Sequence, residues 1–297
     1  MKAITNRQIC ELKELGIPAP IDSKVEILEA EQIKKCYPVR ARNSHKGTYG
    51  SATIVAGSEK YPGAAALSLK GALRSGCGYV KLASSEYVKD LLAPKLPQVI
   101  YLDEPDLSSR AIAIGMGMGA TRETYDKVAD LIKNYDGLLI IDADGLNALS
   151  AFGVDILKEK NCRVILTPHV KEFSRLTKLS VEDILNNPVE LAKEFSLKYG
   201  VTLLLKGAAS IICEGDRVAL NIRGTTALAK GGSGDILSGF MCGCLARGLA
   251  PFEAASCVAY TLGVAAEIAS AEKTDYCATA DDIIKNLHFS VKRLTSM

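Results

Sequence analysis

Residues 111–141 read AIAIGMGMGATRETYDKVADLIKNYDGLLII, and this stretch decides the fold. It holds two short apolar runs, Ala111–Ile114 and Leu138–Ile141, on either side of a segment with helical spacing, Arg122–Asn134. Runs that are apolar at every position are typical of strands buried on both faces of a parallel sheet. The stretch therefore predicts a βαβ unit, in which the helix crosses over one face of the sheet.

The same two patterns continue on both sides of this unit. Nearly continuous apolar runs predict further strands at Ala52–Ala56, Tyr79–Ala83, Arg163–Leu166, Val201–Leu205 and Ser210–Cys213. Helical spacing predicts helices over Ala64–Ser75, Pro188–Lys198, Asp235–Ala246 and Phe252–Ala271. Strands that alternate with helices predict a three-layer α/β/α domain with a mostly parallel central sheet. Ligands of such sheets gather at the carboxyl ends of the strands, so the loops that follow strands are searched first.

Composition excludes several classes of function. The chain has 297 residues, 36 Lys+Arg against 34 Asp+Glu, and a formal net charge of +2. Hydrophobic residues make up 48% and charged residues 24%, which excludes wholesale disorder. The near-neutral balance gives no electrostatic footprint for nucleic acid or for an anionic membrane. The scarcity of His, with 3 residues, and the absence of Trp argue against a His-built metal site or a base-stacking surface.

The cysteines and the N-terminus bear on the compartment. None of the nine cysteines forms a C-x-x-C pair, and most stand among apolar neighbours, which favours a reducing cytoplasm. The first residues lack the apolar core of a signal peptide. The longest charge-free apolar stretch near the C-terminus, Ala254–Ala266, is too short to span a bilayer. These features predict a soluble cytoplasmic protein.

Residues 1–44 differ from the rest of the chain. They are rich in Glu and Lys and contain Pro18, Pro20 and Pro38, with few strand-like runs. We expect a lead-in segment with one short helix, Glu29–Cys36, followed by one domain over residues 45–297.

The strongest local signal for function is a glycine-rich loop. Gly231-Gly232-Ser233-Gly234 precedes a long apolar helix. Glycines let the backbone turn its N–H groups inward as an anion nest, and the helix N-terminus adds its positive dipole end. Asp235 follows at once, where a carboxylate can act as the base for an attacking hydroxyl or can cap the helix. The loop is not a Walker A motif, and Gly115–Gly119 is not a dinucleotide fingerprint.

Other loops after predicted strands carry polar residues. Asp142 and Asp144 open a helix, where they can face a metal–phosphate complex or Asp144 can cap. His169 lies at the carboxyl end of a predicted strand, which favours ligand contact. Lys206-Gly207-Ala208-Ala209-Ser210 joins two strands, either as a nucleotide contact or as an ordinary hairpin. A second helix start with Pro and small residues, at Tyr61–Ala66, gives two anion-receptive helix ends and suggests two phosphorylated ligands.

From about His45 to the end, the chain resembles the ADP-dependent NAD(P)H-hydrate dehydratases, a ribokinase-like family that repairs hydrated nicotinamide cofactors. The motifs that carry the resemblance stand in the family's order: His45–Gly50, Pro62–Ala65, Gly115 with Gly117, Asp142–Asp144, Thr167–His169 with Glu172-Phe173, Lys206-Gly207 and Ala229–Asp235. Three departures from the family pattern are Met116, Val170-Lys171 and Thr225-Thr226.

The resemblance implies a repair reaction and a set of site residues. The S forms of hydrated NADH and NADPH (NADHX and NADPHX) would be dehydrated, with ADP as co-substrate converted to AMP and phosphate. Asp235 would be catalytic. The hydrated dinucleotide would contact Ala65, Gly117, His169 and Asp235. The adenine nucleotide would contact Lys206, Gly207, Ala208, Ala209, Ser210 and Gly234. Mg²⁺ and a homotetramer are expected, and no residue is assigned as a metal ligand.

The segment around Leu15–Pro18 resembles the end of an epimerase domain and its linker in two-domain members of the family. Forty-odd residues cannot form that domain, so we expect no epimerase activity in this chain and a separate epimerase as partner.

Two alternatives to the dehydratase stay open. One is a ribokinase-like kinase acting on a hydroxymethyl vitamin precursor, which would share the glycine loop and Asp235. The loop His45–Gly50 and the helix start Pro62–Ala65 favour a large dinucleotide over a small ring. The other is a non-catalytic nucleotide-binding protein, against which the intact Asp235 and glycine nest argue. The sequence leaves ADP against ATP, and NADHX against NADPHX, undecided.

Overall fold

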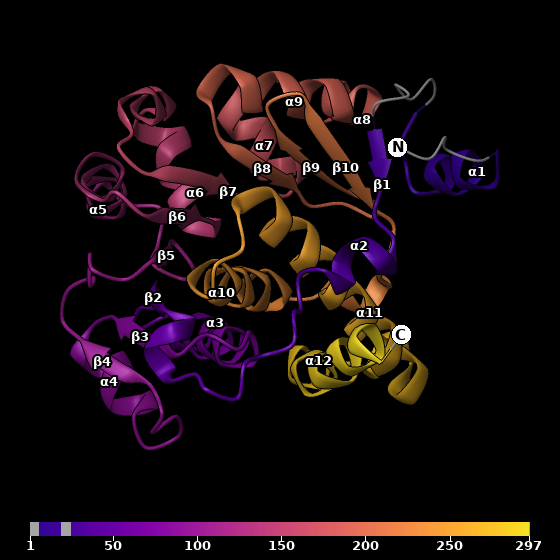
Figure 1. Cartoon of the computed structure of the whole chain (residues 1–297). Helices are drawn as coiled ribbons and strands as arrows, with labels where there is room; N and C mark the ends of the chain where they lie inside the picture. The colour runs from indigo at the N-terminus through magenta and orange to yellow at the C-terminus, as the bar shows by residue number, and fades with distance from the viewer. Residues whose placement is uncertain (1–5, 19–24, 297) are drawn as a thin grey trace.

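The computed structural model describes residues 6–18 and 25–296. Its centre is a ten-stranded sheet in the order β1-β10-β9-β8-β7-β6-β5-β2-β3-β4 (Figure 1). The strands are β1 Val25–Ile27, β2 Ser51–Val55, β3 Tyr79–Ala83, β4 Ile100–Leu102, β5 Ala111–Ile114, β6 Leu138–Ile141, β7 Arg163–Leu166, β8 Thr202–Leu205, β9 Ser210–Glu214 and β10 Arg217–Asn221. Strand β9 runs antiparallel to both of its neighbours, and the other pairings are parallel.

Helices cover both faces of this sheet, which confirms the predicted α/β class and its layers. One buried cluster joins the sheet to α2 Ala30–Lys34, α3 Pro62–Arg74, α4 Glu86–Leu92, α10 Ser233–Ala246, α11 Pro251–Cys277 and α12 Ala280–Thr295. The opposite cluster joins it to α1 Asn6–Glu14, α5 Arg122–Asn134, α6 Ala143–Phe152, α7 Val170–Thr177, α8 Val181–Asn186 and α9 Pro188–Tyr199. Side chains alternate between these clusters along each strand, since successive residues of a strand face opposite ways.

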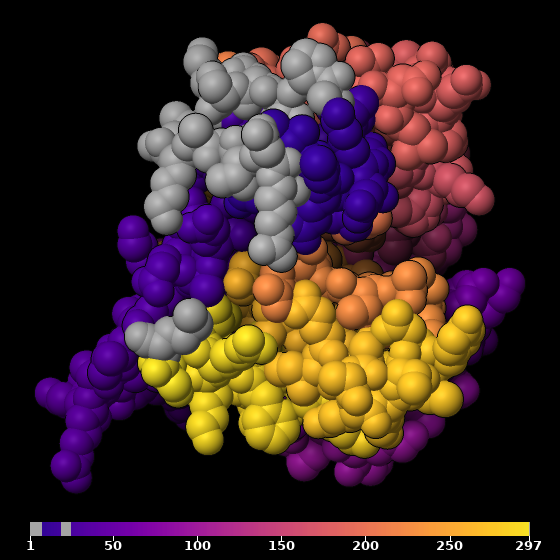
Figure 2. Space-filling model, turned by 90° about the vertical axis from the view of Figure 1, so that its right-hand side faces the viewer, coloured from indigo at the N-terminus to yellow at the C-terminus, as the bar shows by residue number. Residues whose placement is uncertain are grey.

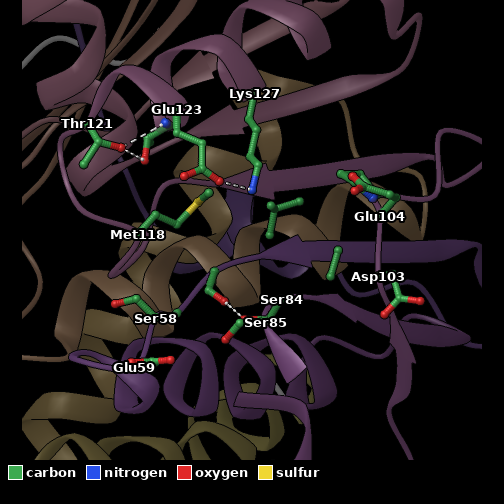
Figure 3. A pocket seen from close by; sticks show the side chains of 16 residues that line it. Ser58, Glu59, Ser84, Ser85, Asp103, Glu104, Met118, Thr121, Glu123 and Lys127 are labelled. Atoms are coloured by element: carbon green, nitrogen blue, oxygen red, sulfur yellow. Dashed lines mark hydrogen bonds and ion pairs between the residues drawn. The ribbon is translucent and has the colours of Figure 1, made fainter. Parts of the chain in front are cut away.

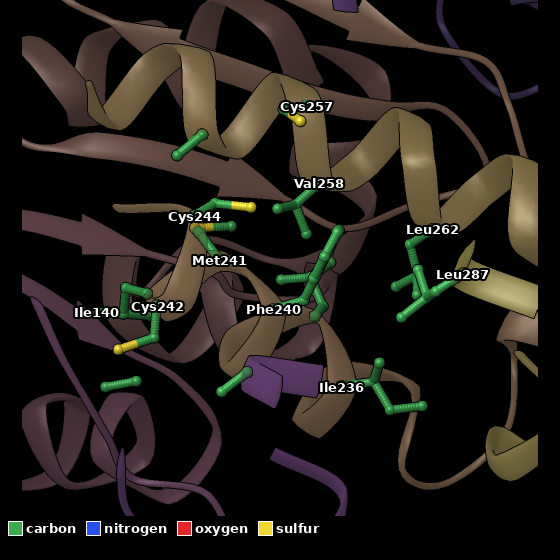
Figure 4. Close-up of a cluster of buried hydrophobic side chains, with 14 of the residues drawn as sticks. Ile140, Ile236, Phe240, Met241, Cys242, Cys244, Cys257, Val258, Leu262 and Leu287 are labelled. Carbon is green, nitrogen blue, oxygen red and sulfur yellow. The ribbon is translucent and has the colours of Figure 1, made fainter. Parts of the chain in front are cut away.

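Helix α10 is the core helix of the first cluster. It is apolar nearly all round, as expected of a helix surrounded by protein. Its Phe240 is fully buried, in the same cluster as Val258 and Leu262 of α11 (Figure 4). It also packs directly on α3, where a Cβ at Gly239 would lie 1.9 Å from the Ser68 carbonyl oxygen. This backbone contact requires glycine and fixes where α10 begins relative to the sheet.

Part of the predicted lead-in segment belongs to the same core. Strand β1 pairs in parallel with β10, and Ile33 of α2 is buried in the first cluster. Figure 2 shows the described residues of this segment (indigo) seated against the later parts of the chain. The predicted short helix is present but shorter than expected, Ala30–Lys34 in place of Glu29–Cys36. The part of the segment at residues 19–24 lies outside the described residues.

Helix α11 is longer than the apolar stretch singled out in the sequence. Among the described residues it is long and apolar enough, by length and composition alone, to cross a membrane. However, 78% of its most apolar window is buried inside the fold, as in the core helix of a globular domain. The stretch Ala254–Ala266 therefore lies in the buried N-terminal part of α11.

Candidate functional site

The glycine-rich loop forms the start of α10. Gly232 is the N-cap and has φ of +96°, a conformation that L side chains rarely adopt. A Cβ there would also lie 2.5 Å from a methyl group of Leu67. The Ser233 hydroxyl is buried and has no hydrogen-bond partner within the described residues. Because the first N–H groups of a helix lack intrahelical partners, this turn is suited to hold an anion.

Asp235 stands in the first turn of α10, directly behind this loop. Its carboxylate does not cap the helix, because the N-cap is Gly232, and no hydrogen bond to it occurs in the part of the chain described. Burial raises the pKa of Asp235 to about 7, and the negative charges of Asp142 and Asp144 add to the rise, while Lys206 opposes it. A carboxylate with a pKa near the working pH is matched to general-base catalysis.

Asp142 is the buried anchor of the site. It directly follows β6 and is 1% exposed. The Ser238 hydroxyl of α10 donates to its Oδ2 at 2.6 Å, and the Lys206 ammonium donates to its Oδ1 at 2.9 Å. Asp142 thus ties β6, the end of β8 and the first turns of α10 together. Asp144 was expected either to face a metal–phosphate complex or to cap the helix. Its main contact is different, since its Oδ2 accepts the Gly119 N–H at 2.8 Å. It holds the preceding glycine loop.

Lys206 stands among negative groups. Burial acts to lower its pKa, but Asp142 and Glu172 raise it, with a net rise that keeps the ammonium charged. Glu172 lies 3.9 Å from the Lys206 nitrogen, and burial raises the pKa of Glu172. The position that a Cβ would take at Gly234 is 3.5 Å from the Lys206 nitrogen. A fixed positive charge therefore lies beside the anion-receptive turn, where it favours a phosphate group.

His169 caps a helix and is also partly exposed to solvent. It is the N-cap of α7: its Nδ1 accepts the Glu172 N–H at 3.1 Å, and its own N–H donates to Glu172 Oε2 at 2.8 Å. The side chain is still 48% exposed at the carboxyl end of β7. Burial, followed by the charges of Lys206 and Arg175, lowers its pKa, so the ring is neutral at pH 7. The predicted ligand contact stays a prediction.

The remaining predicted residues fall into two groups. Gly207 and Ala208 are exposed and Ala209 is buried in the turn between β8 and β9, which is an antiparallel hairpin. This turn adjoins Lys206 and thus the start of α10. Ala65 and Gly117 lie elsewhere: Ala65 is in the first turn of α3, and Gly117, in the loop after β5, packs against the start of that helix, where a Cβ on it would lie 2.6 Å from the Ala64 methyl group. Ala65 is fully buried, so neither its methyl group nor its backbone is exposed to a ligand in this structure, and its predicted substrate contact stays a prediction.

The described residues contain no cluster of three or more His, Cys, Asp or Glu side chains that could hold a resident metal ion. Mg²⁺ often binds through one or two carboxylates plus substrate phosphates and water. The site therefore fits a metal that arrives with a nucleotide better than one caged by protein.

Comparison with known proteins gives matches over most of the chain. The family model described as NAD(P)H-hydrate dehydratase matches residues 52–288. The ADP-dependent (S)-NAD(P)H-hydrate dehydratase of Bacillus subtilis is 35% identical over 264 residues, which cover 85% of this chain and 93% of that protein. The bifunctional NAD(P)H-hydrate repair enzyme of Thermofilum pendens is 35% identical over 255 residues, 80% of this chain and 48% of that enzyme. This chain thus spans about half the length of the bifunctional relatives.

Solved structures agree with these matches. The Bacillus subtilis ADP/ATP-dependent NAD(P)H-hydrate dehydratase, co-crystallised with ATP and Mg²⁺, superposes with a TM-score of 0.81 at 34% identity and covers 91% of this chain and 99% of that chain. The hydroxyethylthiazole kinase of Pyrococcus horikoshii superposes with a TM-score of 0.60 at 15% identity over 89% of this chain and 92% of that one, a likeness of fold alone.

Proposed function

Because this chain belongs to the NAD(P)H-hydrate dehydratase family, we propose that it converts the S forms of hydrated NADH and NADPH back to the reduced dinucleotides, with ADP split into AMP and phosphate. The observation that carries the proposal is the Asp235 carboxylate, free of a cap hydrogen bond, raised in pKa to about 7 and placed behind the turn of Gly232–Gly234. Hydroxide is a poor leaving group, and a phosphoryl group makes the same oxygen a good one.

In the proposed reaction, Asp235 accepts the proton of the ring hydroxyl as its oxygen attacks the β-phosphorus of ADP. The bond from that phosphorus to the bridging oxygen breaks, and AMP leaves. The lone pair of the ring nitrogen then expels phosphate, and loss of a proton from the neighbouring ring carbon restores the double bond. The N–H groups of the first turn of α10 and the charge of Lys206 stabilise the transferring phosphoryl group. Water is removed in sum, and ADP becomes AMP and phosphate.

The nucleotide is proposed to lie between the hairpin Lys206–Ser210 and Gly234. Lys206 is held by Asp142 at 2.9 Å, so its charge stays fixed when a phosphate binds. Mg²⁺ bound to the nucleotide would supply further charge neutralisation. The homotetramer, the separate epimerase and the cytoplasmic location stay predictions from the resemblance and the composition.

The test is turnover of hydrated NADH with ADP, followed by the return of the reduced-nicotinamide absorbance. Asp235→Asn keeps size and shape but removes the base, so turnover should fall by at least ~10²-fold. Binding of ADP, measured by calorimetry, should survive because backbone groups and Lys206 hold the phosphates. The matched control is Asp126→Asn on the exposed surface of α5, where the carboxylate pairs with Arg122 at 2.8 Å. Its turnover should equal that of the unmodified protein.

Three outcomes would redirect the proposal. Near-normal turnover by Asp235→Asn would remove Asp235 from the mechanism. Phosphorylation of a hydroxymethyl compound by ATP, without turnover of hydrated NADH, would make the protein a small-molecule kinase. Binding of ADP without either reaction would make it a non-catalytic nucleotide-binding protein.

A further inference from the structure

A cavity lies at the carboxyl edge of the sheet, away from the start of α10. It is a cavity of about 420 Å³ over the ends of β2 and β3 (Figure 3), within the size range of small-molecule sites. Its walls come from the loops after β2, β3, β4 and β5 and from the first turns of α5. Residues of the proposed catalytic turn do not line it.

This cavity adjoins two predicted substrate residues, Ala65 in the first turn of α3 and Gly117 in the loop after β5. Its wall residue Gly57 packs on Ala65, because a Cβ at Gly57 would lie 2.9 Å from the Ala65 methyl group. The wall residue Met118 directly follows Gly117, where a Cβ would lie 2.6 Å from the Ala64 methyl group. The start of α3, which is suited to an anionic group, therefore stands next to the cavity.

The topology sets how far a ligand must reach. Asp142, whose charge acts on Asp235, directly follows β6, and the sheet continues β6-β5-β2-β3. Three strand spacings amount to about 14 Å. A compact ring bound at Asp235 does not cover that distance. A dinucleotide does, with its nicotinamide end at Asp235, its pyrophosphate near the start of α3 and its adenosine end in the cavity.

The walls of the cavity carry more negative than positive charge. Four carboxylates line it, Glu59, Asp103, Glu104 and Glu123, against one ammonium, Lys127. Glu123 pairs with Lys127 at 2.9 Å (Figure 3), and Asp103 pairs with a lysine outside the cavity. Glu59 and Glu104 are exposed and have no ion pair among the described residues. No arginine lines the cavity.

These charges distinguish the two dinucleotides at the only place where they differ. Hydrated NADH carries a ribose 2′-hydroxyl at its adenosine end, and a carboxylate accepts a hydrogen bond from such a hydroxyl. Hydrated NADPH carries a 2′-phosphate there, which proteins hold with arginine and which carboxylates repel. We propose that this cavity binds the adenosine end of the substrate and that its carboxylates select hydrated NADH over hydrated NADPH; the proposal rests on the dehydratase function proposed above.

The test compares kcat/KM for the two hydrates with saturating ADP. Two unpaired carboxylates at a solvent-exposed wall give about tenfold preference for hydrated NADH at low salt. The preference should shrink at 0.5 M salt, because exposed charges are screened. Glu104→Lys should reduce the preference for hydrated NADH about tenfold, because it raises kcat/KM for hydrated NADPH. The matched control is Glu182→Lys on the exposed surface of α8, which makes the same charge change away from the cavity and should leave the ratio unchanged.

The selectivity and the dehydratase function can fail separately. Turnover of both hydrates with equal kcat/KM, or a preference that Glu104→Lys does not alter, would overturn the selectivity and leave the function standing. Absence of turnover with either hydrate would overturn the function. Calorimetric binding of NAD⁺ and NADP⁺ tests the cavity without turnover: NAD⁺ should bind more tightly, and equal or tighter binding of NADP⁺ would overturn the proposal. Melting temperatures of both variants verify that they fold.

Discussion

Replacing Asp235 by asparagine should stabilise the folded protein above neutral pH while it removes activity. Burial, with the charges of Asp142 and Asp144, raises the pKa of this carboxyl from 3.8 to about 7. The folded protein therefore binds a proton more tightly at this group than the unfolded chain does. Between about pH 4 and pH 7 folding takes up a proton here, so the group's contribution to the free energy of unfolding falls as pH rises through that window.

The size of the effect follows from the shift. From 3.8 to about 7 is about 3 pKa units, and at 1.36 kcal/mol per unit the ionised carboxylate costs at most about 4 kcal/mol above pH 7. The asparagine amide is also polar and is buried in the same place, so it recovers part of this amount. We expect a gain of about 2 kcal/mol at pH 8 and a rise in Tm of about 4 °C.

The assay is thermal unfolding of the unmodified protein, Asp235→Asn and the surface control Asp126→Asn at pH values from 4.5 to 8.5. The Tm difference for Asp235→Asn should be near zero at pH 4.5 and grow toward pH 8, while the control shows no such trend. A difference that is constant with pH, or that favours the unmodified protein at pH 8, would refute the reasoning. It would mean that the carboxylate gains a partner when it ionises.

Three further predictions concern the support of the site and are measured by urea unfolding. Asp142→Ala should lower the free energy of unfolding by about 3 kcal/mol, since it leaves the Lys206 ammonium without its nearest counter-charge. A decrease below 1 kcal/mol would contradict the anchoring role. Gly239→Ala should cost about 3 kcal/mol, because its Cβ would meet a backbone carbonyl of α3 at 1.9 Å, whereas Gly231→Ala, with open space around it, should change stability by less than about 0.5 kcal/mol. Phe240→Ala should cost about 3–5 kcal/mol, because the ring is fully buried and leaves a cavity.

The sequence predicted the central strands with high precision. The predicted strands Tyr79–Ala83, Ala111–Ile114, Leu138–Ile141 and Arg163–Leu166 are confirmed to the residue. Their apolar runs are unambiguous because both faces are buried. The predicted family and its α/β fold are confirmed as well. Strands β1, β4 and β10 were missed. Strands β1 and β4 have only three residues each and lie at the sheet edges, and β10 follows β9, which runs antiparallel to both of its neighbours.

The sequence also singled out the glycine turn and Asp235, because a turn with positive φ followed by a helix start has a local signature. It did not determine what surrounds them. The hydrogen bond from Ser238 to Asp142 joins residues 96 positions apart, and the pair of Asp142 with Lys206 joins residues 64 apart. Periodicity and turn chemistry act over a few residues, whereas burial and the distances between charges depend on how strands and helices are ordered in space. The glycine loop and the position of Asp235 could therefore be predicted from the sequence, whereas the anchoring of α10, the raised pKa of Asp235 and the acidic cavity depend on the tertiary structure.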